Sequence, residues 1–369
     1  MKDFRAPGER EAHDRAWDVV RAAYETRDPV IWPRRHARPL AAVGLVTAVV
    51  AAALSPPGRS VIHSLRKAVG VQNAQTELFS LPAPGRLLVT GAGGTWVVRS
   101  DGSRRRVGAY RDATWSPHGL FIAATRPNEL VALDPQGHVY WTLARRSARF
   151  PAWIGTRTDT RIAYLSGGHL RVVAGDGTSD QAIASAAAVA PAWRPGAGRV
   201  VAYVPPGGGA VARDVDTGAV RLRTPRTTVT KLAWSDDGRL LLAFAPYGSR
   251  VYDARGRVVQ DESPSNATHD ADGGFVPGTH RVAFIRVHGL GSDVGSDVFT
   301  GRDGRLVLSG SGLFGQLAFS RNGRWMLVTW PTANQWVFVR NGRRKIVGAA
   351  QIARQFGGFP RIEGWCCGS

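Results

Sequence analysis

The chain is poor in cysteine and in lysine, and each shortage excludes a class of protein. Its 369 residues include two cysteines, too few for a scaffold held together by several disulfides. Lysine occurs at four positions, so arginine supplies nearly all the basic charge behind the formal net charge of +20. The arginines are scattered along the chain rather than gathered in one run. This pattern favours general surface charge over a dedicated polyanion-binding surface, and nucleic acid is not an expected partner.

Local signatures of catalysis and metal binding are also missing. The nine histidines stand singly, without the H-x-x-x-H or H-E-x-x-H spacing of a zinc site. There is no G-x-S-x-G elbow, and the glycine run at 207–209 lacks the lysine of a phosphate loop. Asp293 and Asp297, in the tandem G-S-D-V-G-S-D-V, offer two carboxylates but no complete oxygen cage for a cation. We therefore expect a non-catalytic protein without metal or cofactor.

Long uncharged stretches are scarce, and the only one is P-L-A-A-V-G-L-V-T-A-V-V-A-A-A-L-S at residues 39–55. Its length, about 17 residues, is at the lower limit for a helix that spans a bilayer. Arg34, Arg35 and Arg38 precede it, and such a basic cluster holds the preceding segment in the cytoplasm. We predict an uncleaved single-pass anchor in the cell membrane, with everything after residue 55 outside. Cleavage near the A-x-A pattern of Ala51 and Ala53 is the alternative.

Amphipathic segments flank this apolar stretch. Residues 9–27 alternate charges around an apolar stripe at helical spacing, which predicts a short helix within a cytoplasmic tail of residues 1–38. This helix is either part of a partly ordered tail or a docking element for a cytoplasmic partner. Residues 56–78 form a juxtamembrane segment with a second amphipathic pattern, which lies on the membrane surface or packs against the following domain.

The remaining residues, 79–369, repeat one short motif, an aromatic residue followed by a tight turn. The clearest copies are W-S-P-H-G at Trp115, W-S-D-D-G at Trp234 and F-S-R-N-G at Phe319. Seven such aromatic residues, which we call the anchors, recur about every 40 residues, the spacing of four-stranded propeller blades. The anchors are Trp115, Trp153, Trp193, Trp234, Phe275, Phe319 and Trp365. We expect them to pack the blades rather than to form a ligand platform.

A second series of turns supports the first. Asp-Gly or Asn-Gly pairs, some with intervening residues, begin at Asp101, Asp134, Asp176, Asp214, Asp253, Asp303 and Asn341. Because Gly, Asn and Asp tolerate the positive φ of tight hairpins, these sites predict hairpin turns between short strands. His118 stands where other repeats have Asp237 and Asn322, which indicates a turn role. The two series, in phase, predict an all-β, seven-bladed β-propeller.

Neither end of this region makes a whole blade. Residues 79–109 supply three strands, and the C-terminal R-I-E-G-W-C-C supplies one, so pairing the two ends closes the ring without an open edge. Cys366 and Cys367 lie in this last strand. Adjacent Cα atoms are about 3.8 Å apart, below the usual disulfide range of about 4.4–6.8 Å. Two packed thiols are therefore favoured, and a vicinal disulfide in an oxidising exterior is the alternative.

The W-S-P-x-G and W-S-x-D-G turns resemble the propeller repeats of TolB-like proteins, relatives of the WD-repeat family. The resemblance covers residues 79–369, but no blade carries the Gly-His and Trp-Asp pair of true WD repeats. Propellers host unrelated activities, so the resemblance implies the fold more strongly than a function.

These observations predict a membrane-anchored, extracytoplasmic propeller that binds an envelope protein, polymer or ligand through loops at one mouth of the ring. One alternative is a transmembrane regulator, in which the propeller senses a ligand and the helix at 9–27 binds a cytoplasmic partner, as in membrane-bound sigma-factor regulators. A lesser alternative is a propeller-fold hydrolase or lyase, which would need histidines and carboxylates that converge at the channel mouth.

Overall fold

The computed structural model describes residues 73–75, 80–156, 159–196, 198–263, 268–301, 304–342 and 345–367. The predicted cytoplasmic tail, the apolar stretch at 39–55 and Arg34, Arg35 and Arg38 lie outside the described residues. Within the described ranges, no helix has both the length and the apolar character needed to cross a membrane.

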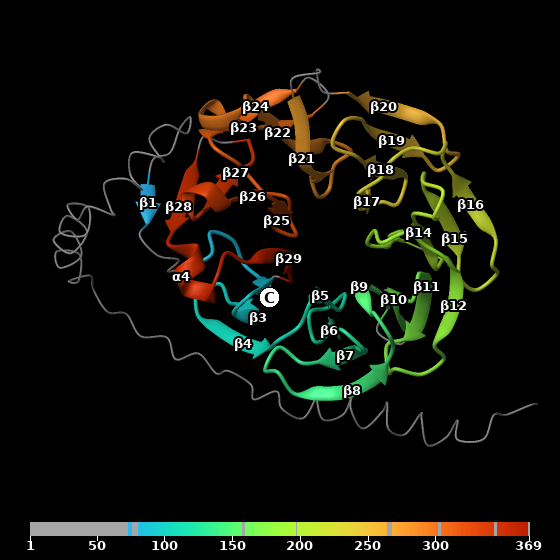
Figure 1. Cartoon of the computed structure of the whole chain (residues 1–369). Coiled ribbons are helices and arrows are strands. Elements are labelled where there is room, and N and C mark those ends of the chain that lie inside the picture. The colour runs from blue at the N-terminus through green and yellow to red at the C-terminus, as the bar shows by residue number, and fades with distance from the viewer. Residues whose placement is uncertain are drawn as a thin grey trace, which may run out of the picture. The chain divides into compact units, whose positions relative to one another are not determined.

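The described strands form seven antiparallel sheets arranged radially around one axis (Figure 1). Six blades have four strands, which are given below in order from the axis outward. The seventh has a fifth strand, β1 (Asn73–Gln75), at its outer edge. Blade 1 contains β29 (Arg361–Cys366), β2 (Arg86–Gly91), β3 (Gly94–Val98) and β4 (Arg104–Gly108). Blade 2 contains β5 (Asp112–Trp115), β6 (Ile122–Arg126), β7 (Glu129–Leu133) and β8 (Val139–Ala144). Blade 3 contains β9 (Arg149–Gly155), β10 (Thr160–Ser166), β11 (His169–Ala174) and β12 (Gln181–Ser185).

The other blades follow in chain order. Blade 4 contains β13 (Ala192–Trp193), β14 (Val200–Tyr203), β15 (Val211–Asp214) and β16 (Val220–Arg223). Blade 5 contains β17 (Lys231–Trp234), β18 (Leu240–Phe244), β19 (Ser249–Asp253) and β20 (Val258–Glu262). Blade 6 contains β21 (Thr268–Phe275), β22 (Val282–His288), η1 (Gly291–Asp293), β23 (Gly295–Thr300) and β24 (Arg305–Ser311). Blade 7 contains β25 (Leu317–Phe319), β26 (Trp325–Trp330), η2 (Pro331–Ala333), β27 (Gln335–Arg340) and β28 (Ile346–Ala350).

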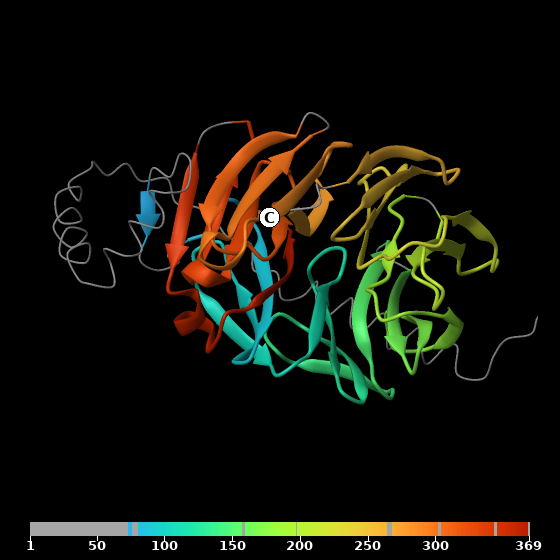
Figure 2. The same cartoon turned by 45° about the horizontal axis from the view of Figure 1, so that its top comes forward.

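Both predicted series of turns occur, and they lie at the same edge of the ring. The anchors lie at or within two residues of the ends of the innermost strands. In blades 2 to 7 the following turn, which we call the inner turn, leads to the second strand. The Asp-Gly and Asn-Gly sites join the third strand to the fourth, and we call these the outer turns. In blade 5, Asp253 Oδ1 accepts hydrogen bonds from the amides of Arg255 and Arg257, while Gly256 has a φ of 80°. Because the strands alternate in direction, both kinds of turn share one edge, which we call the turn face (Figure 2).

The ring closes as the sequence predicts, through pairing of the last strand with the first complete hairpin. β29 pairs antiparallel with β2, with Cys366 opposite Arg86 and Trp365 opposite Leu87. Two features were not anticipated. β1 (Asn73–Gln75), in the stretch assigned to the juxtamembrane segment, pairs parallel with β28 at the rim of blade 7. A short helix, α4 (Ile352–Phe356), connects blade 7 to β29.

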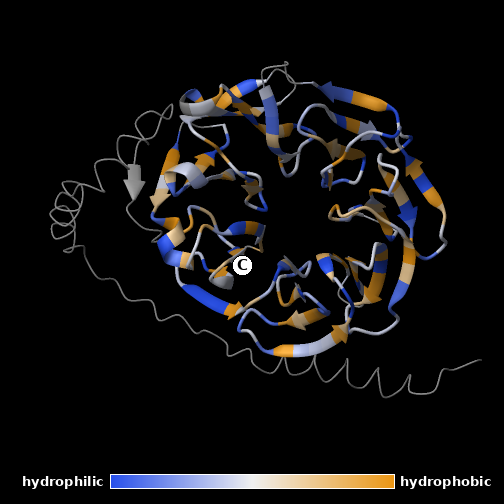
Figure 3. Ribbon diagram, viewed as in Figure 1, coloured by the Kyte–Doolittle hydropathy of each residue, from blue (hydrophilic) through white to orange (hydrophobic). Residues whose placement is uncertain are grey.

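The core of the described residues is divided among the blade interfaces rather than being one central mass. Each of seven apolar clusters is built from two neighbouring sheets. The cluster between blades 7 and 1, which we call the closure interface, includes Trp325, Trp336, Phe338, Phe356 and Trp365, all buried. Figure 3 shows the corresponding alternation of apolar and polar residues along the strands. Burial of apolar surface between sheets is therefore what holds neighbouring blades together.

Candidate functional site

The anchors lie between neighbouring blades at the turn-face end of the innermost strands. Trp115, Trp193, Trp234, Phe275 and Trp365 are buried, and Trp153 and Phe319 are partly buried. The indole N–H groups of two anchors donate hydrogen bonds to the preceding blade: Trp193 Nε1 to the carbonyl oxygen of Ala152 (2.9 Å), and Trp234 Nε1 to that of Ala192 (3.1 Å). These contacts place the anchors in blade packing. Trp115, Phe319 and Trp365 also form part of the wall of a hollow described below.

A ring of polar contacts joins the innermost strands three residues before the anchors. Asp112 Oδ2 accepts the amide of Phe150 in the next blade (3.3 Å), and Asp272 Oδ2 accepts that of Leu317 (2.8 Å). Gln316 Oε1 accepts the amide of Ile362 (2.9 Å), which links blade 7 to blade 1. Because the side chain at this position hydrogen-bonds the backbone of the next blade, these residues fix the radial register of the ring.

The strongest charged network of the channel connects blades 1, 2 and 3. The Arg361 guanidinium, on β29, donates to Asp112 Oδ1 (3.1 Å) and to Glu363 Oε1 (2.6 Å). Arg149, on β9, donates to Asp112 Oδ2 (3.0 Å) from the other side. Burial raises the pKa of Glu363 to about 7, although the charge of Arg361 opposes this shift. Glu363 is therefore a carboxyl group that changes its charge near neutral pH.

Glu363 lies in the wall of a hollow of about 600 Å³ that opens at the turn face. The residue two positions after an anchor contributes to this hollow in six blades: Pro117, Pro195, Asp236, Pro277, Arg321 and Cys367. In blade 3 the corresponding residue, Gly155, lines a separate hollow of about 460 Å³. Three prolines and the rings of Trp115, Phe319 and Trp365 supply the apolar part of the wall, while Asp236, Arg321 and Glu363 supply the charges. We call this space the mouth hollow.

The rim of the mouth hollow is held together where blade 1 lacks an inner turn, because β29 and β2 come from distant parts of the chain. Arg86 Nη2 donates to the carbonyl oxygen of Gly119 in blade 2 (2.6 Å), and its guanidinium lies 4.9 Å from the centre of the Trp115 ring. From blade 7, Arg321 Nη1 donates to the carbonyl oxygen of Pro117 (3.4 Å). These contacts connect the inner turns of blades 7 and 2 across the gap.

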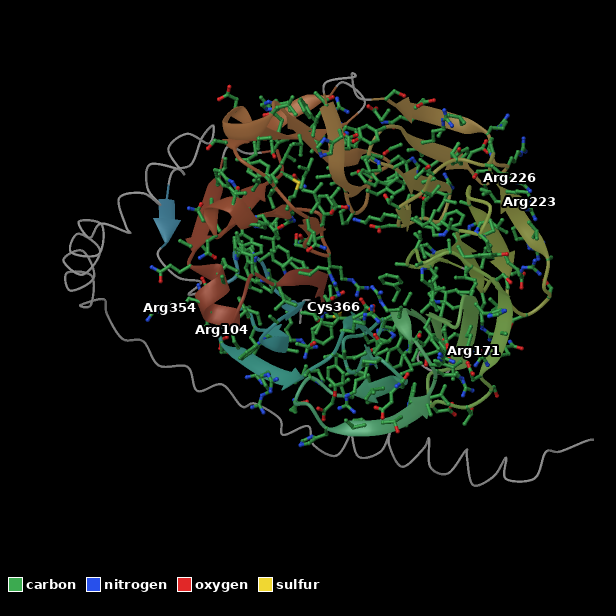
Figure 4. The ribbon with its side chains drawn as sticks, viewed as in Figure 1. Arg104, Arg171, Arg223, Arg226, Arg354 and Cys366 are labelled. Atoms are coloured by element: carbon green, nitrogen blue, oxygen red, sulfur yellow. A yellow bond between two sulfur atoms is a disulfide. The ribbon has the colours of Figure 1, made fainter. Side chains whose placement is uncertain are left out.

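Cys366 and Cys367 occupy this gap, close to the axis of the ring (Figure 4). Their sulfur atoms are bonded to each other, whereas two packed thiols were favoured from the sequence. The sequence argument placed both residues on a strand, but β29 ends at Cys366, and Cys367 has a φ of 52°. A Cβ atom on Gly119, which has a φ of 68°, would lie 2.6 Å from the Cys367 sulfur. The vicinal pair therefore packs directly on the inner turn of blade 2.

The other polar residues singled out from the sequence do not form a site. His118 is exposed in the inner turn of blade 2, at the position of Asp237 and Asn322. Asp293 ends η1, and Asp297, on β23, pairs instead with His288 Nε2 (3.4 Å). Among the residues that the structure describes, no three His, Cys, Asp or Glu side chains come together as metal ligands. The carboxylates that do converge, Asp112 and Glu363, share Arg361 rather than a histidine.

The sequence does not predict the mouth hollow, although six of its lining residues occur at a constant offset of two residues after an anchor. That offset is the only signal in the sequence that could have identified them. The offset indicates a shared site only once the anchors are known to lie near the ends of strands arranged around one axis.

Comparison with known proteins yields the fold and no family. No known family matches the chain, and no curated protein matches it. A chain of the solved Kuenenia stuttgartiensis hydrazine synthase is 13% identical over 63% of this chain and 76% of that chain, with a TM-score of 0.52. A chain of the mitotic checkpoint complex is 16% identical over 65% of this chain and 76% of that chain, with a TM-score of 0.50. At such identities the likeness shows that the chain shares the fold of WD40-type propellers, here with seven blades.

Proposed function

We propose that the protein is a membrane-anchored, extracytoplasmic β-propeller that acts as a non-catalytic binding platform, with the mouth hollow as the binding site. One observation carries this proposal: six of the seven blades each place one side chain, two residues after the anchor, around the same hollow. A concave site that combines apolar surface with fixed polar groups, as the mouth hollow does, is suited to binding a ligand. The apolar stretch at 39–55 supports the anchoring.

The chemistry of the mouth hollow favours a narrow occupant, such as an extended segment of an envelope protein or polymer. Proline and aromatic surfaces offer rigid apolar contacts that lose little conformational entropy on binding. Arg321 and Glu363 add a fixed cation and a carboxyl group that titrates near pH 7. Binding that involves Glu363 should therefore change between pH 6 and 8.

Site-specific photocrosslinking in intact membranes tests the position of the binding site. A photoreactive amino acid at His118, in the inner turn beside the mouth hollow, should give a discrete adduct with an envelope component. The matched control carries the same amino acid at Arg255, an exposed residue in an outer turn of blade 5. Adducts from position 255 and none from position 118 would show that the rim, not the mouth, is the binding surface.

The transmembrane regulator remains the second candidate because of the amphipathic pattern at residues 9–27. The discriminating experiment compares crosslinked membrane pull-downs of the full chain with those of a chain lacking residues 1–28. Equal recovery of envelope components from both chains supports the binding platform. Loss of a cytoplasmic partner with the truncated chain would instead support signalling across the membrane. Extraction by alkaline carbonate, which removes peripheral proteins, would contradict the anchor itself.

A further inference from the structure

Carboxylates are distributed unevenly around the ring. No Asp or Glu occurs in residues 304–362, which include blade 7 and α4, and residues 80–111 of blade 1 contain only Asp101. These two stretches, which we call the basic sector, contain fifteen Arg and Lys residues. Residues 112–303, which build blades 2 to 5 and most of blade 6, contain 21 basic and 18 acidic residues. The arginines are thus scattered, as the sequence analysis noted, but the net positive charge is concentrated in two neighbouring blades.

Several arginines outside the basic sector, most of them half-buried, are paired with carboxylates. Arg145 and Arg171 contact Asp180, Arg250 contacts Asp261, and Arg257 contacts Asp253. Such pairs neutralise the surface locally, so this part of the ring offers little attraction to an anion.

The described cations of the basic sector mostly contact neutral groups. Arg104, Arg105 and Arg106 are exposed along the first part of β4, which Figure 3 shows as hydrophilic up to the apolar tip of the strand. Arg104 donates to the side-chain amide oxygen of Gln355, in α4, near Arg354 in Figure 4. Arg106 Nε donates to the carbonyl oxygen of Gly93 (2.9 Å). These contacts orient the guanidinium groups without cancelling their charge.

Several cations of the basic sector lie in the turn face. Arg321 and Arg324 belong to the inner turn of blade 7, and Lys345 follows its outer turn. The two turns are joined, because the amide of Asn341 donates to the carbonyl oxygen of Arg324 (2.9 Å). Arg324 and Lys345 are both exposed. Blade 7 therefore presents fixed positive charge at one edge of the ring.

The chain enters the ring at this same edge. β1 runs parallel to β28, and Asn73 lies opposite Val347, two residues after Lys345. The apolar stretch at 39–55 precedes β1 in the sequence by seventeen residues. Any membrane that this stretch spans is therefore tethered to the rim of blade 7, at the end where the cations of the turn face lie.

We infer that the turn face of blades 7 and 1 rests on the anionic lipid headgroups of the membrane to which the chain is anchored. This inference depends on the proposed membrane anchoring and adds the orientation of the propeller to it. A cation near an anionic bilayer surface improves association by about fivefold, and this attraction decays within a Debye length of about 8 Å at physiological salt. Residues 112–303, with 21 basic and 18 acidic residues, gain far less from such a surface.

The test uses the full chain reconstituted in phosphatidylcholine vesicles, with or without phosphatidylglycerol, and a lipid that carries a nitroxide on its headgroup. A fluorescent amino acid is placed at Asn322 in blade 7 or at Asp237 in blade 5. The two positions are matched, because each occupies the same site of an inner turn and accepts the serine hydroxyl two residues earlier. We expect headgroup quenching at 322 to be about twice that at 237, only with phosphatidylglycerol, and to fall in 0.5 M salt to about the neutral-lipid level.

Charge reversal adds a second readout. The double variant Arg324→Glu/Lys345→Glu should lose the extra quenching at 322, whereas Arg223→Glu/Arg255→Glu, which changes two exposed arginines outside the basic sector, should keep it. Equal quenching at 322 and 237 with phosphatidylglycerol present would overturn the inference. So would saturable binding of polyphosphate that Arg324→Glu/Lys345→Glu abolishes while lipid quenching is unaffected, because the partner would then be a soluble polyanion. Failure of the chain to float with either vesicle would contradict the anchoring itself, a result distinct from equal quenching.

Discussion

The closure interface and the interface between blades 2 and 3 both hold neighbouring blades together, but they differ in the size and composition of their apolar clusters. Blades 2 and 3 follow each other in the chain, and their cluster is small, with Ala123, Leu130, Ala148, Ile162, Tyr164 and Val173 as its buried members. At the closure interface the cluster is larger and rich in aromatic rings, and α4 adds Ile352 and Phe356 to it. Each aromatic side chain buries about 150–250 Å². The closure interface thus has more apolar contact than the interface between blades 2 and 3.

Blade 1 also differs from the other blades in the polar contacts that hold it at the turn face. Every other blade has a covalent inner turn. At blade 1, Arg86 from β2 and Arg321 from blade 7 instead donate hydrogen bonds to carbonyl oxygens of blade 2. Removing contacts from the closure interface should therefore damage the ring more than equivalent changes elsewhere, because no covalent connection limits the separation of β29 from β2.

Deletion of residues 361–369 should have the largest effect. It removes β29, exposes the edge of β2 and uncovers the closure interface, which should abolish the cooperative unfolding transition, since domains are stable by only about 5–15 kcal/mol. Circular dichroism during heating measures this, with gel filtration to detect aggregates. Deletion of residues 368–369 alone, which leaves β29 intact, is the control. A variant without residues 361–369 that melts at the temperature of the full chain would show that β29 does not close the ring.

Trp365→Ala should come next, with a loss of about 3–5 kcal/mol in the free energy of unfolding, because it leaves a large cavity in the closure interface. Trp365 packs edge-to-face on Phe338, with ring centres 5.8 Å apart. The matched change, Trp153→Ala, concerns a partly buried anchor between blades 2 and 3 and should cost less. Urea denaturation of both variants provides the comparison. Equal losses would mean that the closure interface contributes no more than any other.

Asp112→Ala should cost about 3 kcal/mol, because it leaves the guanidinium groups of Arg149 and Arg361 without their shared carboxylate. The corresponding change in blade 6, Asp272→Ala, removes a contact with Lys231 and the amide of Leu317. Since Arg361 comes from β29, Asp112→Ala should also loosen ring closure, which hydrogen exchange of the β2 and β29 amides would detect. Exchange that accelerates equally in β25 and β29 would argue against a specific role at the closure.

Glu363→Gln should have the smallest effect, and one that depends on pH. The pKa of Glu363 is raised from 4.5 to about 7 in the folded chain, so the folded state binds more protons than the unfolded state between these values. Stability from this group is therefore lost as the pH rises from 4.5 to 7, by roughly 2 kcal/mol. The glutamine variant lacks this dependence, so its stability relative to the native chain should increase between pH 4.5 and 8. A constant difference in urea midpoints at these two pH values would contradict the shift.

Most of the fold could be predicted because its signals are local and repeated. The anchors lie at or near the ends of strands, and the Asp-Gly and Asn-Gly sites form hairpin turns. The strands within 79–109 and the strand around Trp365 each form only part of a blade, so the sequence predicts that they pair. β1 and α4 escaped because a three-residue strand and a five-residue helix have no periodicity to recognise.

The site was less predictable because its members are neighbours only around the axis. Pro117 and Arg321 are 204 residues apart in the chain, yet Arg321 donates to the carbonyl oxygen of Pro117. Glu363 gave no signal either, since its raised pKa arises from burial beside Arg361 and not from a motif. The vicinal disulfide is not expected from the sequence because adjacent Cα atoms are closer than in ordinary disulfides, yet Cys366 and Cys367 are bonded with their Cα atoms 3.7 Å apart, where the chain leaves β29.

The position two residues after each anchor has a consequence for how such a protein diversifies. These residues lie outside the strand ladders and the blade clusters, so exchanging one of them alters the opening while the ladders stay in place. Asp236 and Arg321 also hydrogen-bond other blades, and exchanging either of them removes that contact. The lining of the mouth hollow can therefore be changed at six positions, each by a single substitution. A small library that varies Pro117, Pro195, Asp236, Pro277 and Arg321 would sample new specificities on an unchanged frame, and homologous propellers are free to drift in the same way.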